Sequence, residues 1–238
     1  KSAGCLAALK KEKDKMVARR VWDESAVDEW ANVRKNDKDA SVGRIFSIMG
    51  EKHAERRLPE ADKEYKARIV FAGNNIQTAS GVAPHELFQE VSSAPAAMAS
   101  VRATLAVGAL RGWRPMMRDA AQAYIQATIV GPGRPATWVR LPRSMWPPEW
   151  LTKDGKPIYS DPVVPLLKAL YGHPESGALW EKHLASILTG LKWKKCDSHP
   201  GIWIHASGAV LAVYVDDLLM VAPRDQEDAL WAAIASKV

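Results

Sequence analysis

The chain has 238 residues, 47% of them hydrophobic and 25% charged, so it can bury a sizeable core in one or two domains, and wholesale disorder is excluded. Its 33 Lys and Arg against 27 Asp and Glu give a net charge of +6 and a pI near 9.3. This modest excess is compatible with a polyanionic partner, nucleic acid or anionic membrane, and equally with an ordinary, slightly basic protein.

Two cysteines, Cys5 and Cys196, are too few for a disulfide framework or a cysteine-rich zinc site, which indicates a reduced, intracellular protein. No apolar run is long enough to cross a bilayer, and no signal peptide is visible. The chain does not begin with Met, and its last residue, Val238, falls within a predicted helix. We therefore expect a piece of a longer polyprotein.

The first part of the chain predicts helices and strands in alternation. Residues 1–20 are basic and predict a solvated helix or a frayed end rather than a nucleic-acid-binding arm. Residues 22–36 have the spacing of an amphipathic helix. Strands are predicted at 42–51 and 65–72, with a charged loop or helix at 53–62 between them.

Residues 96–110 are Ala-rich and apolar, which predicts a buried helix. The elements predicted after it are a strand at 116–119, a turn at 131–135, a strand at 137–141, an irregular excursion at 142–161, an amphipathic helix at 175–191, strands at 201–205, 210–215 and 218–222, and a helix at 224–238. Interleaved helices and short strands, with antiparallel hairpins late in the chain, indicate an α+β fold.

Two adjacent carboxylates, Asp216 and Asp217, lie between two apolar, strand-like runs. A two-residue connection of this kind predicts a tight hairpin with the two aspartates at its turn. Two neighbouring carboxylates near apolar surroundings repel each other and are costly to desolvate, and divalent cations would relieve that cost. Asp119, at the end of the 116–119 strand, is the natural third member. Enzymes of nucleotidyl transfer use strand-end carboxylates that converge on paired Mg²⁺ ions.

The segment Tyr214–Met220 resembles the Tyr-x-Asp-Asp box of reverse transcriptases, and the chain is more specifically similar to those of copia-type long-terminal-repeat retrotransposons. Further matches in the family's order are Tyr65–Val70, Asp119–Ile125, Leu170–Gly172 with Trp180 downstream, and, more loosely, Thr137–Pro142 and Asp197–Pro200. The resemblance covers roughly residues 22–238. One box would be weak evidence, whereas several in the right order make coincidence improbable.

The resemblance implies that Asp119 and Asp216 are the main ligands of two Mg²⁺ (or Mn²⁺) ions, with Asp217 beside them. Tyr124 would pack under the sugar of the incoming nucleotide and exclude a 2′-hydroxyl. Arg68 and, less surely, Lys66 would grip the triphosphate from a fingers hairpin. Read without the family, Tyr124 is a core aromatic and the two cations belong to a solvated strand face.

Gly172 to Gly177 would form the loop and helix start that face the base pair in the family. Glu175 replaces the common Gln there, and a carboxylate near a triphosphate is unwelcome unless it points away or pairs with a base. We interpret Cys196, His199 and His205 as loop and strand residues because a zinc site needs about four ligands. Trp180 and Trp193 are interpreted as core anchors rather than stacking platforms.

The resemblance implies a right-hand polymerase with an antiparallel palm sheet and an absent or truncated thumb. Residues 1–21 would be a basic lead-in and 22–238 the reverse transcriptase domain, with fingers mainly at 40–95 and palm mainly at 96–238. Its partners would be an RNA or DNA template with primer, deoxynucleotides, and integrase and ribonuclease H segments of the same polyprotein. No membrane partner is expected, and the compartment would be a cytoplasmic particle or the nucleus.

The leading hypothesis is therefore an RNA-directed DNA polymerase that extends a primer 3′-end. One alternative is an inactive retrotransposon remnant that folds and binds nucleic acid without polymerising, which Glu175 and the absent thumb favour. A second alternative is an unrelated metal-dependent phosphotransferase that happens to carry Asp-Asp.

Overall fold

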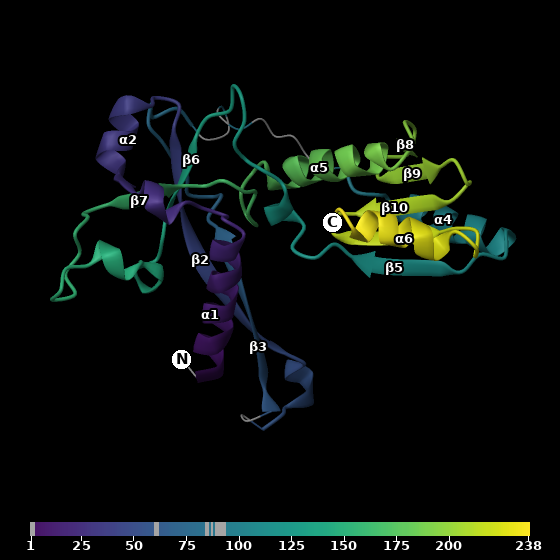
Figure 1. Cartoon of the computed structure of the whole chain (residues 1–238), viewed down its shortest axis with the longest axis horizontal. Helices are drawn as coiled ribbons and strands as arrows, with labels where there is room; N and C mark the ends of the chain where they lie inside the picture. The colour runs from purple at the N-terminus through teal and green to yellow at the C-terminus, as the bar shows by residue number, and fades with distance from the viewer. Residues whose placement is uncertain (1–2, 60–61, 84–85, 87, 89–93) are drawn as a thin grey trace. The chain divides into compact units, whose positions relative to one another are not determined.

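The computed structural model describes residues 3–59, 62–83, 86, 88 and 94–238 (Figure 1). The chain divides into two compact units. Unit 1 comprises residues 1–90 and 128–176, and unit 2 comprises residues 91–127 and 177–238. Each unit is therefore built from two stretches that are separated in the sequence.

Among its described residues, unit 1 carries a six-stranded mixed sheet with the order β1-β7-β6-β2-β3, in which β4 pairs with β2 as a side branch. All pairings are antiparallel except that of β2 with β6, which is parallel. The strands are β1 (Asp28–Glu29), β2 (Ser41–Lys52), β3 (Glu64–Phe71), β4 (Gln77–Thr78), β6 (Thr137–Arg140) and β7 (Pro162–Pro165).

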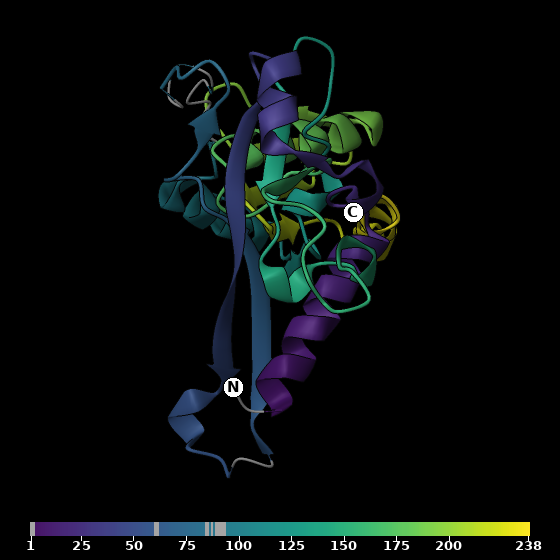
Figure 2. The same cartoon turned by 90° about the vertical axis from the view of Figure 1, so that its left-hand side faces the viewer.

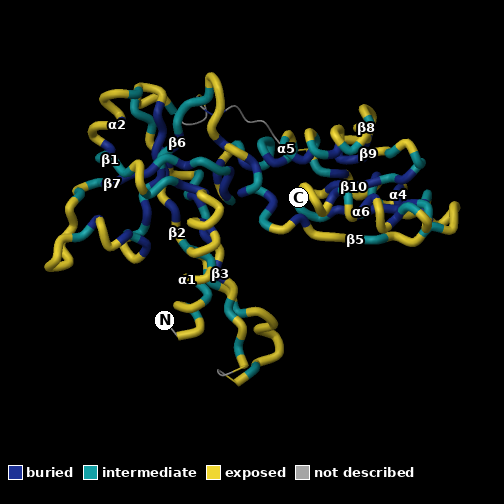
Figure 3. Tube along the Cα trace, viewed as in Figure 1, coloured by how far each residue is buried: buried dark blue, intermediate teal, exposed yellow. Residues whose placement is uncertain are grey.

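The long β2–β3 hairpin confirms both predicted strands. Along β3, Ala67, Ile69 and Phe71 are buried, whereas Lys66 and Arg68 are exposed. This alternation follows because successive side chains of a strand point to opposite faces. Figure 3 shows that burial fades toward the outer end of the hairpin, beyond which a short 3₁₀ helix (Ala54–Arg56) follows β2.

The basic N-terminal segment forms α1 (Ala3–Ala18), as predicted. One side of α1 lies along β3 (Figures 1 and 2). Met16 is buried, and the Lys13 ammonium donates to the carbonyl of Met145 at 2.8 Å. Lys10, Lys11 and Lys15 are exposed, so α1 is a packed element of unit 1 with an exposed basic face.

The single helix predicted at 22–36 is wrong. A 3₁₀ turn (Glu24–Ala26) and the strand β1 precede a short helix, α2 (Trp30–Asn36). Asp23 accepts a hydrogen bond from the amide of Ser25, which starts the 3₁₀ turn. Glu29 accepts from the amides of Ser160 and Asp161, so distant backbone donors hold this stretch extended in place of helical bonds.

The 142–161 excursion is irregular, as expected, but not loose. It contains two 3₁₀ turns (Arg143–Met145 and Pro148–Trp150) whose Met145 and Trp150 side chains are buried. Asp161 ends the excursion in a two-pronged ion pair with Arg140, at 2.7 and 2.8 Å. That guanidinium holds the pKa of the Asp161 carboxyl below its ordinary value.

Unit 2 carries, in its described part, a five-stranded antiparallel sheet with the order β5-β11-β10-β9-β8. The strands are β5 (Pro115–Asp119), β8 (Trp193–Lys195), β9 (Ile202–His205), β10 (Val210–Tyr214) and β11 (Asp217–Val221). With the mixed sheet of unit 1, this confirms the α+β class.

The core of unit 2 lies between this sheet and two helices, α5 (Ser176–Gly190) and α6 (Glu227–Ala235). Trp180, Leu184 and Leu188 recur every four residues along α5 and are all buried, which confirms the predicted amphipathic face. Trp180 and Trp193 are each only 2% exposed, so the prediction that both are core anchors is confirmed.

The helix predicted at 96–110 is present as α4 (Met98–Leu110), but it is not a buried helix. Only Ser100, Thr104 and Gly108 are buried along it, whereas the apolar side chains of Met98 and Leu110 are 64% and 88% exposed. Small side chains let the helix backbone approach the sheet closely: a Cβ at Gly108 would lie 2.7 Å from Cγ1 of Val221. The prediction that this Ala-rich helix is buried is therefore wrong, because only its stripe of small residues is buried.

Candidate active site

The two aspartates of the late hairpin do not share its turn, so the prediction that placed both there is wrong by one residue. Tyr214 pairs with Asp217, which leaves Val215 and Asp216 as the two turn residues and makes Asp217 the first residue of β11. Val215 has a φ of +57°, which is unusual for a β-branched residue. At this first position of a two-residue turn, glycine is the usual choice.

Asp119 lies directly opposite Asp217 in the antiparallel pairing of β5 with β11. Opposite residues of an antiparallel pair point to the same face, with Cβ atoms about 4.5–5.5 Å apart. The ladder continues into the turn, because the amide of Ala120 donates to the Asp216 carbonyl at 2.7 Å. The structure therefore brings Asp119, Asp216 and Asp217 together at one end of the sheet.

The three carboxylates have the chemistry of a divalent-cation site. Oxygen ligands of this kind suit Mg²⁺ and Mn²⁺. Within the described parts of the chain, no hydrogen bond or ion pair engages the side-chain oxygens of Asp119, Asp216 or Asp217. No group of three or more acidic, His or Cys side chains there is close enough to hold a metal ion as it stands. Since like charges directly opposite each other are destabilising, a cation would draw these side chains together.

Tyr124 lies near these carboxylates, in a 3₁₀ turn (Tyr124–Gln126) that follows β5. Its ring packs against the core of unit 2. Burial, and then the negative charge of Asp216, raise the pKa of the Tyr124 hydroxyl. The phenol therefore stays protonated beside Asp216.

Lys66 and Arg68 belong to unit 1, on the exposed face of β3. Their cross-strand partners on β2 are Gly50 and Ile48. Neither cation takes part in an ion pair within the described part of the chain, so both charges are available to an anionic ligand. The sequence placed them correctly on one strand face because their spacing of two matches the strand period.

Gly172, predicted at a nucleotide-facing loop, is explained by packing within unit 1. Its φ is +86°, and a Cβ there would lie 2.1 Å from the carbonyl oxygen of Phe71. The amide of Phe71 in turn donates to the Tyr171 carbonyl at 2.7 Å. The end of β3 and the 171–172 segment thus meet backbone to backbone, which only glycine permits.

Glu175, the residue that departs from the family pattern, forms an ion pair with Arg134 in unit 1, at 2.7 Å between Oε2 and Nη2. Its negative charge is therefore paired with a basic side chain. The arginine comes from the turn at 131–135, which sequence reasoning did not connect to this loop.

His173 lies between Gly172 and Glu175 in the sequence, and its ring is buried against the rings of Phe71 and Phe88. The amide of Glu175 donates to its Nδ1 at 3.2 Å, and its Nε2 lies 3.4 Å from the Thr137 hydroxyl. Burial, and then the nearby charge of Arg134, lower the pKa of the His173 ring to about 3. The imidazole is therefore neutral in the folded chain.

This neutral histidine makes unit 1 sensitive to acid. The folded pKa lies below the unfolded value of 6.5, so its contribution is complete above pH 6.5 and is lost as the pH falls toward 3. Between pH 7 and 5 we expect His173 to cost about 2 kcal/mol of unfolding free energy. Urea unfolding at both pH values measures this, and the loss should shrink in His173→Gln. An equal loss in that variant would show that the ring is already charged when folded.

Cys196 and His199 lie together in the loop before β9, with Sγ and Nδ1 3.8 Å apart and Ser198 hydrogen-bonded to the same nitrogen at 2.8 Å. Neither Cys5 nor Cys196 forms a disulfide bond within the described part of the chain. His205 is hydrogen-bonded locally to Ser207 at 3.0 Å. These contacts agree with the interpretation of Cys196, His199 and His205 as loop and strand residues.

Sequence reasoning missed two groups that contact the hairpin of Asp216 and Asp217. The indole of Trp180 donates to the Val215 carbonyl at 2.7 Å, and the Ala120 amide holds the Asp216 carbonyl. Trp180 already stood out in the sequence by its distance from Leu170–Gly172, but apolar periodicity alone marked it as a core residue. No sequence signal identifies a backbone amide as a contact.

An antiparallel sheet with two strand-end aspartates and a third in the adjoining turn is the arrangement expected of a candidate nucleotidyltransferase. Comparison with family models agrees: residues 49–228 match the model of the reverse transcriptase (RNA-dependent DNA polymerase) family. The chain belongs to this family, in the branch characteristic of copia-type retrotransposons. The resemblance found in the sequence is thereby confirmed, and membership implies a nucleic-acid template and nucleotide substrates. Within the described residues, no helix is long and apolar enough to cross a membrane.

Proposed function

We propose that this chain extends a primer 3′-end with deoxynucleotides, copying RNA or DNA, and that Asp119, Asp216 and Asp217 hold two Mg²⁺ (or Mn²⁺) ions for the reaction. One observation carries the proposal: Asp119 is directly opposite Asp217, with Asp216 in the adjoining turn. The ladder sets residues that are far apart in sequence at the same end of the sheet, and their unpaired charges support the proposal.

Each carboxylate has a distinct role in the proposal. Asp119 and Asp216 would be the main ligands, from the end of a strand and from a turn, and Asp217 would support them from the start of β11. Divalent ions bound there would favour ionisation of the attacking 3′-hydroxyl and stabilise the leaving pyrophosphate. Tyr124, kept protonated by burial and by the charge of Asp216, would pack under the sugar and exclude a 2′-hydroxyl.

The nucleotide contacts assigned to unit 1 form the second part of the proposal. Arg68 would bind the triphosphate through its guanidinium fork, and Lys66 would add a point charge. Their exposure on one strand face supports this role. Gly172 and Glu175 would belong to the loop that borders the nucleotide. The pairing of Glu175 with Arg134 removes the electrostatic objection to a carboxylate there.

We further propose that unit 2 is the palm and that the β2–β3 hairpin of unit 1 belongs to the fingers. Residues 128–176 fold with that hairpin, so in this proposal they accompany the fingers. A thumb would come from elsewhere in the polyprotein, together with integrase and ribonuclease H segments.

The test is primer extension on an RNA template with Mg²⁺ or Mn²⁺, beside the double variant Asp216→Asn/Asp217→Asn. We expect extension by the wild type and none by the double variant, with both proteins folded by circular dichroism. Extension that survives the double substitution would remove these carboxylates from the mechanism. A folded wild type that never extends a primer would favour the inactive remnant.

A further inference from the structure

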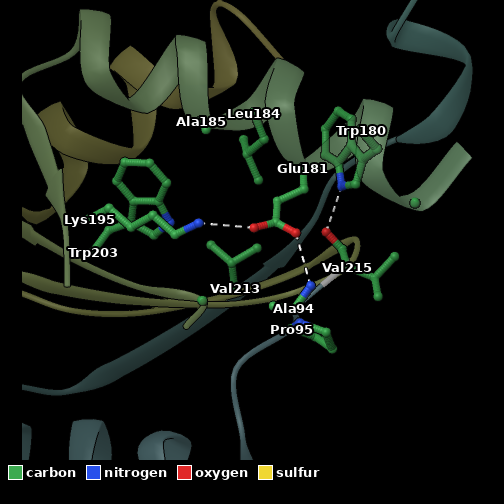
Figure 4. Close-up of a pocket in the computed structure, with 12 residues that line it drawn as sticks. Ala94, Pro95, Trp180, Glu181, Leu184, Ala185, Lys195, Trp203, Val213 and Val215 are labelled. Carbon is green, nitrogen blue, oxygen red and sulfur yellow. Dashed lines mark hydrogen bonds and ion pairs between the residues drawn. The ribbon is translucent and has the colours of Figure 1, made fainter. Parts of the chain in front are cut away.

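Trp180 reaches from α5 to the turn that carries Asp216. The side chain is 2% exposed, and its indole Nε1 donates to the carbonyl oxygen of Val215 at 2.7 Å (Figure 4). Val215 immediately precedes Asp216, so the acceptor belongs to the peptide that leads into the candidate metal ligand.

The peptide on the other side of Asp216 is held as well. Its carbonyl accepts from the Ala120 amide at 2.7 Å. The backbone dihedrals of Asp216 are the rotations between these two peptide planes. Once both planes are fixed, the direction of the Cα–Cβ bond is fixed too, and with it the origin of the carboxylate.

The turn needs such support because Val215 has a φ of +57°. Left-handed backbone at a β-branched residue is strained and persists only where the surroundings over-determine it. Two contacts provide this here: the Val215 side chain packs on the core of unit 2, and its carbonyl receives the indole N–H.

The surroundings make the hydrogen bond hard to replace by water. Figure 4 shows Val213, Val215, Leu184 and Trp203 lining an apolar pocket beside the indole. Glu181, next to Trp180 on α5, accepts from the Ala94 amide at 2.9 Å and pairs with Lys195 at 3.1 Å. These contacts fix the turn of helix that presents the indole.

We propose that Trp180 is a positioning residue for Asp216, because its N–H holds the Val215 peptide in the strained conformation that aims the carboxylate. The inference rests on the proposed function, in which Asp216 binds metal. A positioning role differs from a packing role in the core, in which only the volume of the Trp180 ring would affect the turn.

A matched control separates these two roles. Trp231 lies in the same core cluster, is also 2% exposed, and its indole nitrogen is buried without a hydrogen-bond partner in the described part of the chain. Trp231→Phe therefore removes ring volume without removing a hydrogen bond, and phenylalanine keeps an aromatic face for the Arg118 guanidinium, which lies 5.2 Å from the centroid of the Trp231 ring. Trp180→Phe removes ring volume and also the bond to Val215.

The first measurement is amide hydrogen exchange of residues 214–217 in the metal-free full chain. We expect exchange about five- to tenfold faster in Trp180→Phe than in Trp231→Phe, the factor for loss of one buried hydrogen bond. If Trp180→Phe does not fold, benzothienylalanine at position 180 keeps the ring shape and lacks the N–H. Equal exchange in the matched variants would overturn the inference, whatever the polymerase assay gives.

The second measurement is Mn²⁺ binding, followed by the electron paramagnetic resonance signal of the free ion. We expect affinity about five- to tenfold weaker in Trp180→Phe and unchanged in Trp231→Phe. Unchanged affinity in Trp180→Phe would overturn the positioning role. A wild type that neither binds Mn²⁺ nor extends a primer would instead overturn the proposed function, whatever the exchange rates show.

Discussion

Asp119→Asn is expected to abolish primer extension, by at least about 10³-fold, while leaving the metal-free protein as stable as the wild type or more so. The stability gain follows from the register, because Asp119 faces Asp217 and like charges directly opposite each other are destabilising by about 0.2–1 kcal/mol. Asparagine keeps the shape and removes one of the two charges. Loss of activity with gain of stability is the signature of a residue kept for ligand binding.

With Mg²⁺ present, we expect the wild type to be more stable than Asp119→Asn. A cation that binds only the folded wild type raises its unfolding free energy, whereas the variant gains less. Thermal unfolding with and without Mg²⁺ measures both effects, and Asp154→Asn, an exposed loop carboxylate elsewhere in the chain, controls for net charge. Destabilisation of Asp119→Asn without metal would mean that Asp119 makes a structural contact, and retained extension would exclude it from the site.

The second large effect is expected at Gly172. Gly172→Ala combines left-handed backbone with a Cβ placed 2.1 Å from the Phe71 carbonyl, so we expect a loss of about 2–5 kcal/mol of unfolding free energy. Gly155→Ala is the matched control, since Gly155 has a φ of +72° but no atom near its Cβ position. It should lose only about 1 kcal/mol. Urea unfolding of both variants measures the difference.

The comparison of these two glycines bears on the interpretation of Gly172. A large loss at 172 alone would show that close packing against β3 requires glycine there, and that lost activity in such a variant reflects folding. Equal small losses at both positions would mean that the backbones of Phe71 and Gly172 do not approach as described.

Much of the fold follows from local patterns. The strand alternation at 65–72 identified β3 and put Lys66 and Arg68 on one exposed face, and the four-residue spacing of Trp180, Leu184 and Leu188 identified α5. The same patterns led to the hypothesis of one metal site formed by Asp119, Asp216 and Asp217, because these carboxylates lie at the ends of predicted apolar strands.

What could not be predicted depends on contacts between distant residues. The short strands β1 and β8 have too few residues to show a period and are defined by their partners β7 and β9. The turn at Val215 was misplaced because Asp-Asp has turn-like composition, whereas the observed turn uses a strained valine held by Trp180. On α4, apolar composition outweighed the small-residue stripe that packs on the sheet.

The interleaving of the two units sets the order in which a growing polypeptide can bring the aspartates of the proposed metal site together. β5 emerges from the ribosome before its neighbour β11, which follows only after residues 128–176, a part of the first unit, have been made. Until then Asp119 ends an unpaired strand. A nascent or prematurely terminated product that stops before β11 lacks Asp217 and the strand pairing that sets it opposite Asp119. The proposed metal site can therefore form only after β11 has been synthesised.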